Sequence, residues 1–342
     1  EHSLATVEPS LGRISSDLAR GLVWSALWNA TRDGQLSVEK YLTIAQRHAP
    51  AESNNVLLVS VLANVAFAID RYVPAQQQTH AWHSWIDTTW RQLGEAEPGS
   101  DAQVTWARAL AAAAAHDDRY AAQIRSGLND ADSQDWNPKG ADGDRLLADP
   151  ELRWALWRAL AATGHATTED LDGELARDNT ASGRTAHLRA RMSIPGTQVK
   201  AGAWTQITGR DAPGEALAGE PALTNDQLDA VIDGFQAGSQ PNDWKYVDDY
   251  FALLLPVWEG WSIELARRFV LGLFPHPGAG EITVGGDGVV SDTLLVRDAV
   301  LEKADRWLEQ NNDSPAAVRR LVVEQRDHYA RALRLRVMNA SL

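Results

Sequence analysis

Apolar residues recur along this chain at the spacing of α-helices. One stripe contains Leu228, Val231, Ile232 and Phe235, at positions i, i+3, i+4 and i+7. Comparable stripes occur in five other segments: Val23, Trp24, Leu27 and Trp28; Leu58, Leu62, Val65 and Ile69; Leu265, Phe269 and Leu273; Val296, Val300, Ala304 and Trp307; and Val318, Val322, Tyr329 and Leu333. Because the period is helical throughout, the sequence predicts an all-α protein.

Signals for helix ends agree with these stripes. Helix starts are predicted at two capping boxes, Thr167-x-x-Asp170 and Thr224-x-x-Gln227, and at two capping residues that precede a proline, Asp149-Pro150 and Ser314-Pro315. Helix stops are predicted at Gly164, Gly234 and Pro275. The signals outline on the order of fourteen helices with mostly short connections. This order favours antiparallel helix pairs stacked as a curved HEAT- or armadillo-like α-solenoid, in a single domain over residues 1–342.

Two segments interrupt the helical pattern. Residues 129–148 are acidic and rich in turn-forming residues, which predicts a long loop. Residues 276–292 contain short β-branched runs on either side of Gly-Gly-Asp-Gly, so we expect either a small hairpin or an ordered irregular insertion there.

Composition narrows the classes of function. The hydrophobic fraction of 44% and charged fraction of 23% are typical of a folded globular protein. A net charge of −14 repels phosphate backbones, so nucleic-acid binding is not expected. The chain has no cysteine, and by inspection no apolar run reaches the length of a membrane span. We therefore expect a cytoplasmic protein with no membrane contact.

A search for catalytic or metal-binding motifs finds none that is complete. His80 and His83 are spaced i, i+3, but no third ligand is spaced to join them in a zinc site. Residues 129–148 contain five aspartates that do not fit an EF-hand: Asp130, Asp132, Asp135, Asp142 and Asp144. The D-D-x-x-D pattern of terpenoid cyclases and the G-x-S-x-G serine elbow are also absent. No catalytic residue, metal ligand or cofactor is predicted within this chain.

One basic stripe is a candidate binding site. Arg184, His187 and Arg191 lie at i, i+3 and i+7 on the helix predicted near 183–192. In a chain of net charge −14, such a stripe could attract the carboxylate of a peptide. The alternative is a solvated helix face paired with nearby acidic residues.

Several segments together resemble one known family. They include RGLVWSALWNATRDGQLSVEKYL at 20–42, LRWALWRALAATG at 152–164, a stretch over 174–204 with a turn at 178–180 and a Pro-Gly break at 195–196, VDDYFALLLPVWEGWSIELARRFVLGLFP at 247–275, and VVEQRDHYARALR at 322–334. In order and spacing they resemble the C-terminal α-helical domain of bacterial aminopeptidase N, most like the actinobacterial type. That family consists of zinc metallo-aminopeptidases.

The resemblance implies that zinc binding and the covering of the active site belong to different domains. In such enzymes zinc is held by an H-E-x-x-H helix in a catalytic domain, and this motif is absent from the chain. The resemblance therefore implies a non-catalytic lid, with zinc in the parent enzyme, that caps the active site and shapes a chamber for peptide N-termini. Its expected partners are the parent's catalytic domain and peptide substrates. We also expect weak self-association, as a homodimer through the exposed docking face.

Two alternatives remain open from the sequence. A freestanding α-solenoid scaffold that binds peptides or proteins would share the fold and need no parent enzyme. An all-α enzyme of an unrecognised type is the other. An H-E-x-x-H motif upstream in the same reading frame would exclude the scaffold.

Overall fold

The computed structural model describes residues 2–130, 136, 146–210, 217, 219–238, 244–277, 283–285 and 295–340. Over these ranges the regular structure is almost entirely α-helical, so the predicted all-α class is confirmed. Contacts divide the chain into two compact units: unit 1 contains Glu1–Leu152 and Ala332–Leu342, and unit 2 contains Arg153–Arg331. The prediction of one domain over 1–342 stays a prediction.

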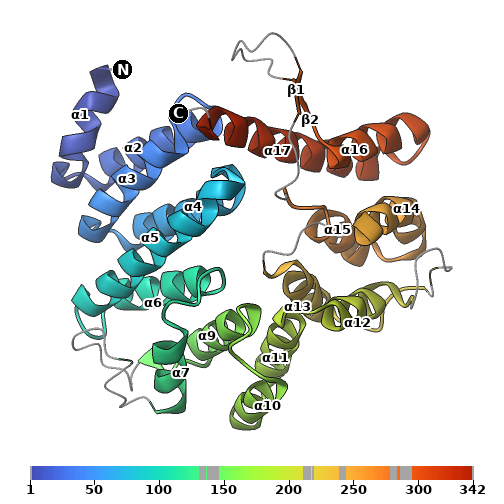
Figure 1. Cartoon of the computed structure of the whole chain (residues 1–342), viewed down its shortest axis with the longest axis horizontal. Coiled ribbons are helices and arrows are strands. Elements are labelled where there is room, and N and C mark those ends of the chain that lie inside the picture. Colours follow the sequence, from blue (N-terminus) through green and yellow to red (C-terminus); the bar gives the residue numbers. More distant parts are fainter. Residues whose placement is uncertain are drawn as a thin grey trace. The chain divides into compact units, whose positions relative to one another are not determined.

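The helices follow one another along the chain (Figure 1). Those of unit 1 are α1 (His2–Ser10), the 3-10 helix η1 (Leu11–Arg13), α2 (Asp17–Arg32), α3 (Val38–His48), the 3-10 helix η2 (Ala49–Ala51), α4 (Asn55–Tyr72), α5 (Ala75–Glu95), α6 (Asp101–Ala114) and α7 (Ala121–Asn129). Those of unit 2 are α10 (Thr168–Arg177), α11 (Ala181–Ser193), α12 (Thr197–Thr208), α13 (Asn225–Gln236), α14 (Trp244–Gly260), α15 (Ile263–Gly272) and α16 (Ala299–Gln310). Residues of both units occur in α9 (Pro150–Ala162) and α17 (Ala316–Ala340).

Three of the four predicted start signals begin helices as expected, and at the fourth, Ser314-Pro315, α17 begins one residue later than predicted, at Ala316. Thr167 and Thr224 form full capping boxes with Asp170 and Gln227, and these boxes begin α10 and α13. Asp149 accepts a hydrogen bond from the backbone N–H of Glu151 in the first turn of α9. The turn at 178–180 and the break at 195–196 separate α10, α11 and α12, as the sequence indicates.

The predicted stripes are helical and largely buried with one exception, although Val23, Trp28 and Phe235 are only half-buried. Leu228, Val231 and Ile232 are buried in α13, and the stripe of α4 from Leu58 to Ile69 is buried as well. The predicted place of Val296 in the helical stripe that ends at Trp307 is wrong. It lies in a β-strand, and α16 begins only after Asp298, whose carboxylate caps the helix.

The interruption near 276–292 contains a strand of a small hairpin. Strand β1 (Thr283–Gly285) pairs antiparallel with β2 (Leu295–Arg297), with Val284 opposite Val296. The second strand lies beyond the predicted boundary. The connection between the strands is outside the described residues, and so is most of the predicted loop at 129–148.

The predicted helix stop at Gly234 is wrong. Helix α13 continues to Gln236, and Gly234 instead allows α13 to approach α11. A Cβ atom at this position would lie 2.3 Å from Cβ of Met192 and 2.8 Å from the carbonyl oxygen of Arg189. Glycine is needed here because any side chain would collide with the neighbouring helix.

Helix α4 corrects the expectation about membrane spans. By length and composition this helix could cross a membrane, since its 18 residues have a mean hydropathy of 1.3, and 39% of them are buried in the structure. The core helix of a soluble protein passes the same test. Unlike a helix buried in a core, α4 has several exposed apolar side chains, among them Val56, Val59 and Phe67.

Gly234→Ala should destabilise the protein by about 1–3 kcal/mol, because α11 and α13 must separate to admit the methyl group. Urea denaturation followed by circular dichroism measures the change. Gly202→Ala in α12 is the matched control, since a Cβ there meets nothing within 4 Å. It should stabilise by about 0.5–1 kcal/mol. Equal effects of the two substitutions would contradict the close packing of α11 against α13.

Candidate functional site

The basic stripe predicted on the sequence lies on α11. Thr180 caps the N-terminus of this helix, and its hydroxyl accepts a hydrogen bond from the N–H of Gly183. A side chain on Gly183 would collide with Asp178, because a Cβ atom would lie 2.0 Å from the carbonyl oxygen of that residue. These contacts fix the start of α11 and thereby the direction in which its stripe points.

The three residues of the stripe have different surroundings. Arg184 is exposed and donates hydrogen bonds to the backbone and side-chain oxygens of Asn179, each at 3.0 Å. His187 has Nε2 2.7 Å from Oδ1 of Asp172, and its ring lies edge-on to Trp154 with centroids 6.0 Å apart. Arg191 is exposed. The geometry thus brings the three onto one helix and engages two of them with neighbouring residues of unit 2.

Another basic residue of this region, Lys200 on α12, is not evident as a candidate from charge alone. It is 7% exposed, and Nζ donates to the carbonyl oxygens of Met192, Gly234 and Ala237 at 3.2, 2.6 and 3.1 Å. These carbonyls belong to the C-terminal ends of α11 and α13, where the helix dipole favours a cation. Burial, with repulsion from Arg158 as a smaller cause, lowers the pKa of Lys200 from 10.5 to about 8. The sequence signal is a lysine at the start of an otherwise apolar stripe that continues through Trp204.

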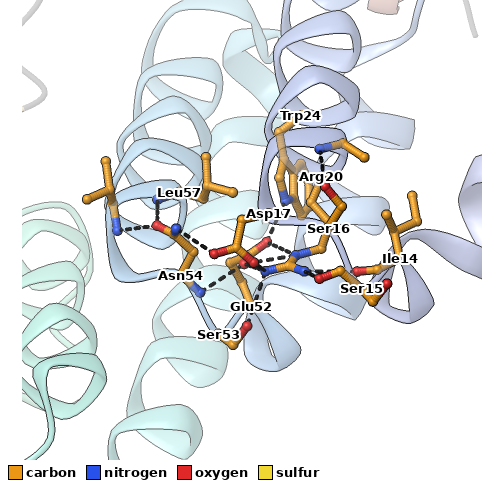
Figure 2. Close-up of polar contacts among 12 residues, drawn as sticks. Ile14, Ser15, Ser16, Asp17, Arg20, Trp24, Glu52, Ser53, Asn54 and Leu57 are labelled. Atoms are coloured by element: carbon orange, nitrogen blue, oxygen red, sulfur yellow. Dashed lines mark hydrogen bonds and ion pairs between the residues drawn. The ribbon is translucent and has the colours of Figure 1, made fainter.

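A buried polar cluster in unit 1 is centred on Glu52, which lies between η2 and α4 (Figure 2). Nε of Arg20 donates to both carboxylate oxygens of Glu52 at 3.0 Å, and Nη2 donates to Oε1 at 2.7 Å. The indole N–H of Trp24 donates to Oε2 at 3.2 Å, and the backbone N–H of Asn54 donates to Oε1 at 3.0 Å. The carboxylate is therefore buried with its oxygens fully engaged.

Opposing causes set the pKa of Glu52. Burial raises it, and this is the largest single cause. The hydrogen bonds from Arg20, from the backbone of Asn54 and from Trp24, with the charge of Arg20, together lower it more. The net result is a pKa below the ordinary value of 4.5, so the carboxylate is held ionised.

The same combination of side chains recurs twice in unit 2. Glu174 of α10 is clamped by Arg153, whose Nε donates to Oε1 at 2.7 Å, and by the indole of Trp157 at 3.0 Å. Asp249 of α14 lies 3.0 Å from Nη1 of Arg210 and accepts the indole N–H of Trp204 at 2.9 Å. In the clusters of Glu52 and Glu174, the arginine and tryptophan are spaced i, i+4 on one helix. This spacing is visible in the sequence, but it does not by itself indicate a carboxylate partner.

These clusters are suited to holding helices together and contain no group arranged for catalysis. Each carboxylate is already occupied by donors, so none is available as a base. Among the described residues, no group of three or more His, Cys, Asp or Glu side chains is placed to hold a metal ion. His83 lies 3.1 Å from Asp117, and His80 is exposed on the same helix. Of the five loop aspartates, only Asp130 lies within the described ranges.

Comparisons with known proteins agree with the resemblance seen in the sequence. The family profile described as "ERAP1-like C-terminal domain" matches residues 1–331. The chain is also 32% identical to a protein named "Aminopeptidase N" from Streptomyces lividans, over 342 residues. That alignment covers 100% of this chain and 36% of the relative. The resemblance to the C-terminal domain of aminopeptidase N is confirmed, for a chain that spans about a third of this relative's length.

Glu52→Gln should lower the free energy of unfolding by roughly 3 kcal/mol near neutral pH, because it leaves the buried Arg20 without its carboxylate. The folded-state pKa of Glu52 is lowered, so its contribution is complete above pH 4.5 and is lost as the pH falls through the folded-state pKa. The difference between the wild type and the variant should shrink on acidification. Denaturant unfolding at several pH values measures this difference.

The control for this experiment is Glu39→Gln, which changes an exposed glutamate in the first turn of α3. Its effect should be within about 0.5 kcal/mol. A Glu52→Gln effect that did not change with pH would contradict an ionised, clamped carboxylate.

Lys200→Met should destabilise unit 2 by about 1–3 kcal/mol, because three helix-terminal carbonyl oxygens lose their donor. The pKa of Lys200 is about 8 when folded and 10.5 ordinarily, so between these values the unfolded chain binds a proton that the folded chain does not. The contribution of Lys200 to stability therefore rises with pH across this window and falls as the pH decreases through about 8. Denaturant unfolding of the wild type and of Lys200→Met at pH values between about 8 and 10.5 tests whether this contribution rises with pH. Lys303→Met, at a lysine ion-paired with Asp248, is the control in the same unit. A wild-type advantage that stayed constant across the window would contradict the lowered pKa.

Proposed function

The chain belongs to the family of ERAP1-like C-terminal domains, and we propose that it is the lid domain of a zinc aminopeptidase. The observation that carries this proposal is its similarity, over its whole length, to 36% of an aminopeptidase N. In the proposed parent enzyme, the catalytic domain holds the zinc ion and cleaves peptides from their N-termini. The lid covers that active site and limits which peptides enter.

The side chains of this chain fit a role without catalysis. The sequence contains no H-E-x-x-H motif. The described residues offer no group of ligands for a metal, so zinc does not fit this part of the parent. The proposed contribution of the chain is to bind peptides, enclose the active site and select which peptides enter, while bond cleavage takes place on the catalytic domain.

A lid of this kind must be stiff and must exclude water. The three buried carboxylate clusters and the close contact of α11 with α13 supply stiffness, because each fixes the relation between neighbouring helices. We propose that the helices stack as antiparallel pairs in a curved solenoid, whose inner face forms the chamber wall. Closing such a wall over an active site removes water and strengthens electrostatic interactions inside it.

The stripe of Arg184, His187 and Arg191 is proposed to meet the carboxylates of bound peptides. Exposed and charged, Arg191 is the member best suited to this contact, since the other two are engaged with Asn179 and Asp172. The proposed setting of the parent enzyme is the cytoplasm. A freestanding peptide-binding scaffold is the second candidate, favoured by an apolar groove within unit 1 that needs no catalytic domain.

The proposal is tested in the full-length parent enzyme and in the isolated 342-residue chain. The isolated chain should hold no stoichiometric zinc and should not cleave leucyl-p-nitroanilide. The parent without these residues should keep its zinc but lose discrimination between short and long peptides, seen as a changed ratio of kcat/KM values. Turnover by the isolated chain, or an unchanged ratio in a zinc-loaded parent that lacks the lid, would overturn the proposal.

If the truncated parent fails to fold, a point variant of the full-length parent provides the test instead. Arg191→Gln in the full-length parent should raise KM for peptides with a free C-terminal carboxylate and leave KM for their C-terminal amides unchanged. Asn312→Asp at an exposed position outside the stripe serves as the control. Equal effects on free and amidated peptides would exclude a carboxylate contact at Arg191.

A further inference from the structure

Helix α4 presents an uncharged apolar stripe to the surface of unit 1. Val56, Val59, Ala63 and Phe67 are spaced i, i+3, i+7 and i+11, and all are exposed. Val56 is 75% and Phe67 48% exposed. No charged residue occurs in α4 before Asp70. Contiguous exposed apolar surface is unfavourable in water, and on soluble proteins it marks places where a ligand or partner binds.

A groove lies beside this stripe, between α4 and α6. Its volume is about 410 Å³, within the range of peptide and small-ligand sites. Leu62 and Trp85, both buried, form its deeper part. Four of its twelve lining residues are alanines, namely Ala63, Ala66, Ala109 and Ala112. Alanine walls leave room for the main chain of a bound segment to approach the helices closely.

The charges around the groove select for a cation. Asp101 lines the groove in the first turn of α6. Arg108 also lines it, but its guanidinium lies 3.3 Å from the carboxylate of Glu151 and 3.6 Å from that of Asp149. Asp101 is thus the one acidic residue that lines the groove, and the charge of Arg108 is offset by two carboxylates outside the lining, on a chain whose net charge is −14. A basic ligand is attracted to this rim, and an acidic one is repelled.

We propose that the α4–α6 groove binds a peptide segment that carries apolar side chains next to a positively charged group. The apolar side chains occupy the groove over Leu62 and Trp85, and the cation lies near Asp101. A second copy of this chain is a poorer occupant, because it would bring another acidic rim against the first. This inference rests on the proposed function, because a chamber that encloses peptides needs a surface that binds the part of the peptide distant from the scissile bond.

The probe is a fluorescein-labelled nonapeptide of alternating leucine and serine with an arginine at its N-terminus, titrated with the isolated chain and followed by fluorescence anisotropy. Ala109→Trp fills the groove and should raise the Kd at least about tenfold, equivalent to about 1.4 kcal/mol. Ala317→Trp, at an exposed alanine in the first turn of α17, is the matched control and should leave the Kd unchanged.

Charge is tested separately from shape. Asp101→Asn should raise the Kd severalfold at low salt and less at high salt, because screening weakens the same interaction in the wild type. A peptide with glutamate in place of arginine, and one with serine in place of every leucine, should each bind more weakly than the probe. Circular dichroism of each variant confirms that it is folded.

Three results would overturn the proposal: no saturable binding of the probe, equal Kd values for Ala109→Trp and Ala317→Trp, or equal binding of the all-serine peptide. Sedimentation that showed a dimer disrupted by Ala109→Trp would assign the groove to a second copy instead. These outcomes are independent of zinc and turnover. Failure of the groove proposal is therefore distinguishable from failure of the lid proposal.

Discussion

Buried carboxylates held between an arginine and an indole N–H are the interactions on which the described helices most depend. Glu52, Glu174 and Asp249 are each at most 8% exposed. A buried charge is tolerated only when its partners are in place, and the loss of one partner typically costs about 3–5 kcal/mol. Since the donors come from neighbouring helices, each cluster ties elements to one another: α2 to the start of α4, α9 to α10, and the end of α12 to α14. Specific polar contacts therefore fix the arrangement of these helices, which burial of apolar surface alone would leave less well defined.

The region around α11 and α13 depends on close packing. Gly234 removes the side chain that would separate the two helices, and Lys200 then supplies an ammonium group to the carbonyl oxygens at their ends. These two features depend on each other, because the lysine reaches its acceptors only when the helix ends are close together. The basic stripe of α11 therefore projects from a rigid support, as the proposed contact with a peptide carboxylate would require.

The polar clusters and the apolar groove have different parts in the proposed lid. The clusters satisfy their own charges internally and present little to a ligand. The groove of unit 1 has exposed apolar walls, an acidic rim and no internal group that fills it. In the proposed enzyme, such a lid would be held rigid by its polar clusters and would bind a peptide at its apolar groove while the catalytic domain performs the reaction.

Much of the fold is readable from the sequence because the signals are local. The period of the apolar residues, the capping boxes at Thr167 and Thr224, and the break at Pro195 act within a few residues, and the structure uses each of them. Family membership is readable too, because it depends on the order of segments along the chain. Arg184, His187 and Arg191 share a helix by spacing alone, whereas their partners Asn179 and Asp172 are set by how α10 and α11 meet.

What only the tertiary structure decided involves residues that are distant along the chain. Gly234 has the local signature of a helix stop, but the proximity of Met192 gives it the role of a packing position inside α13. Val296 has the spacing of a helical stripe, but pairing with Val284 places it in a strand. The sequence by itself determined the helices, the absence of a zinc motif and the likeness to an aminopeptidase domain. The partners of the buried charges and the apolar groove followed from the fold, because the free energies of burial and ion pairing depend on distances that no local pattern encodes.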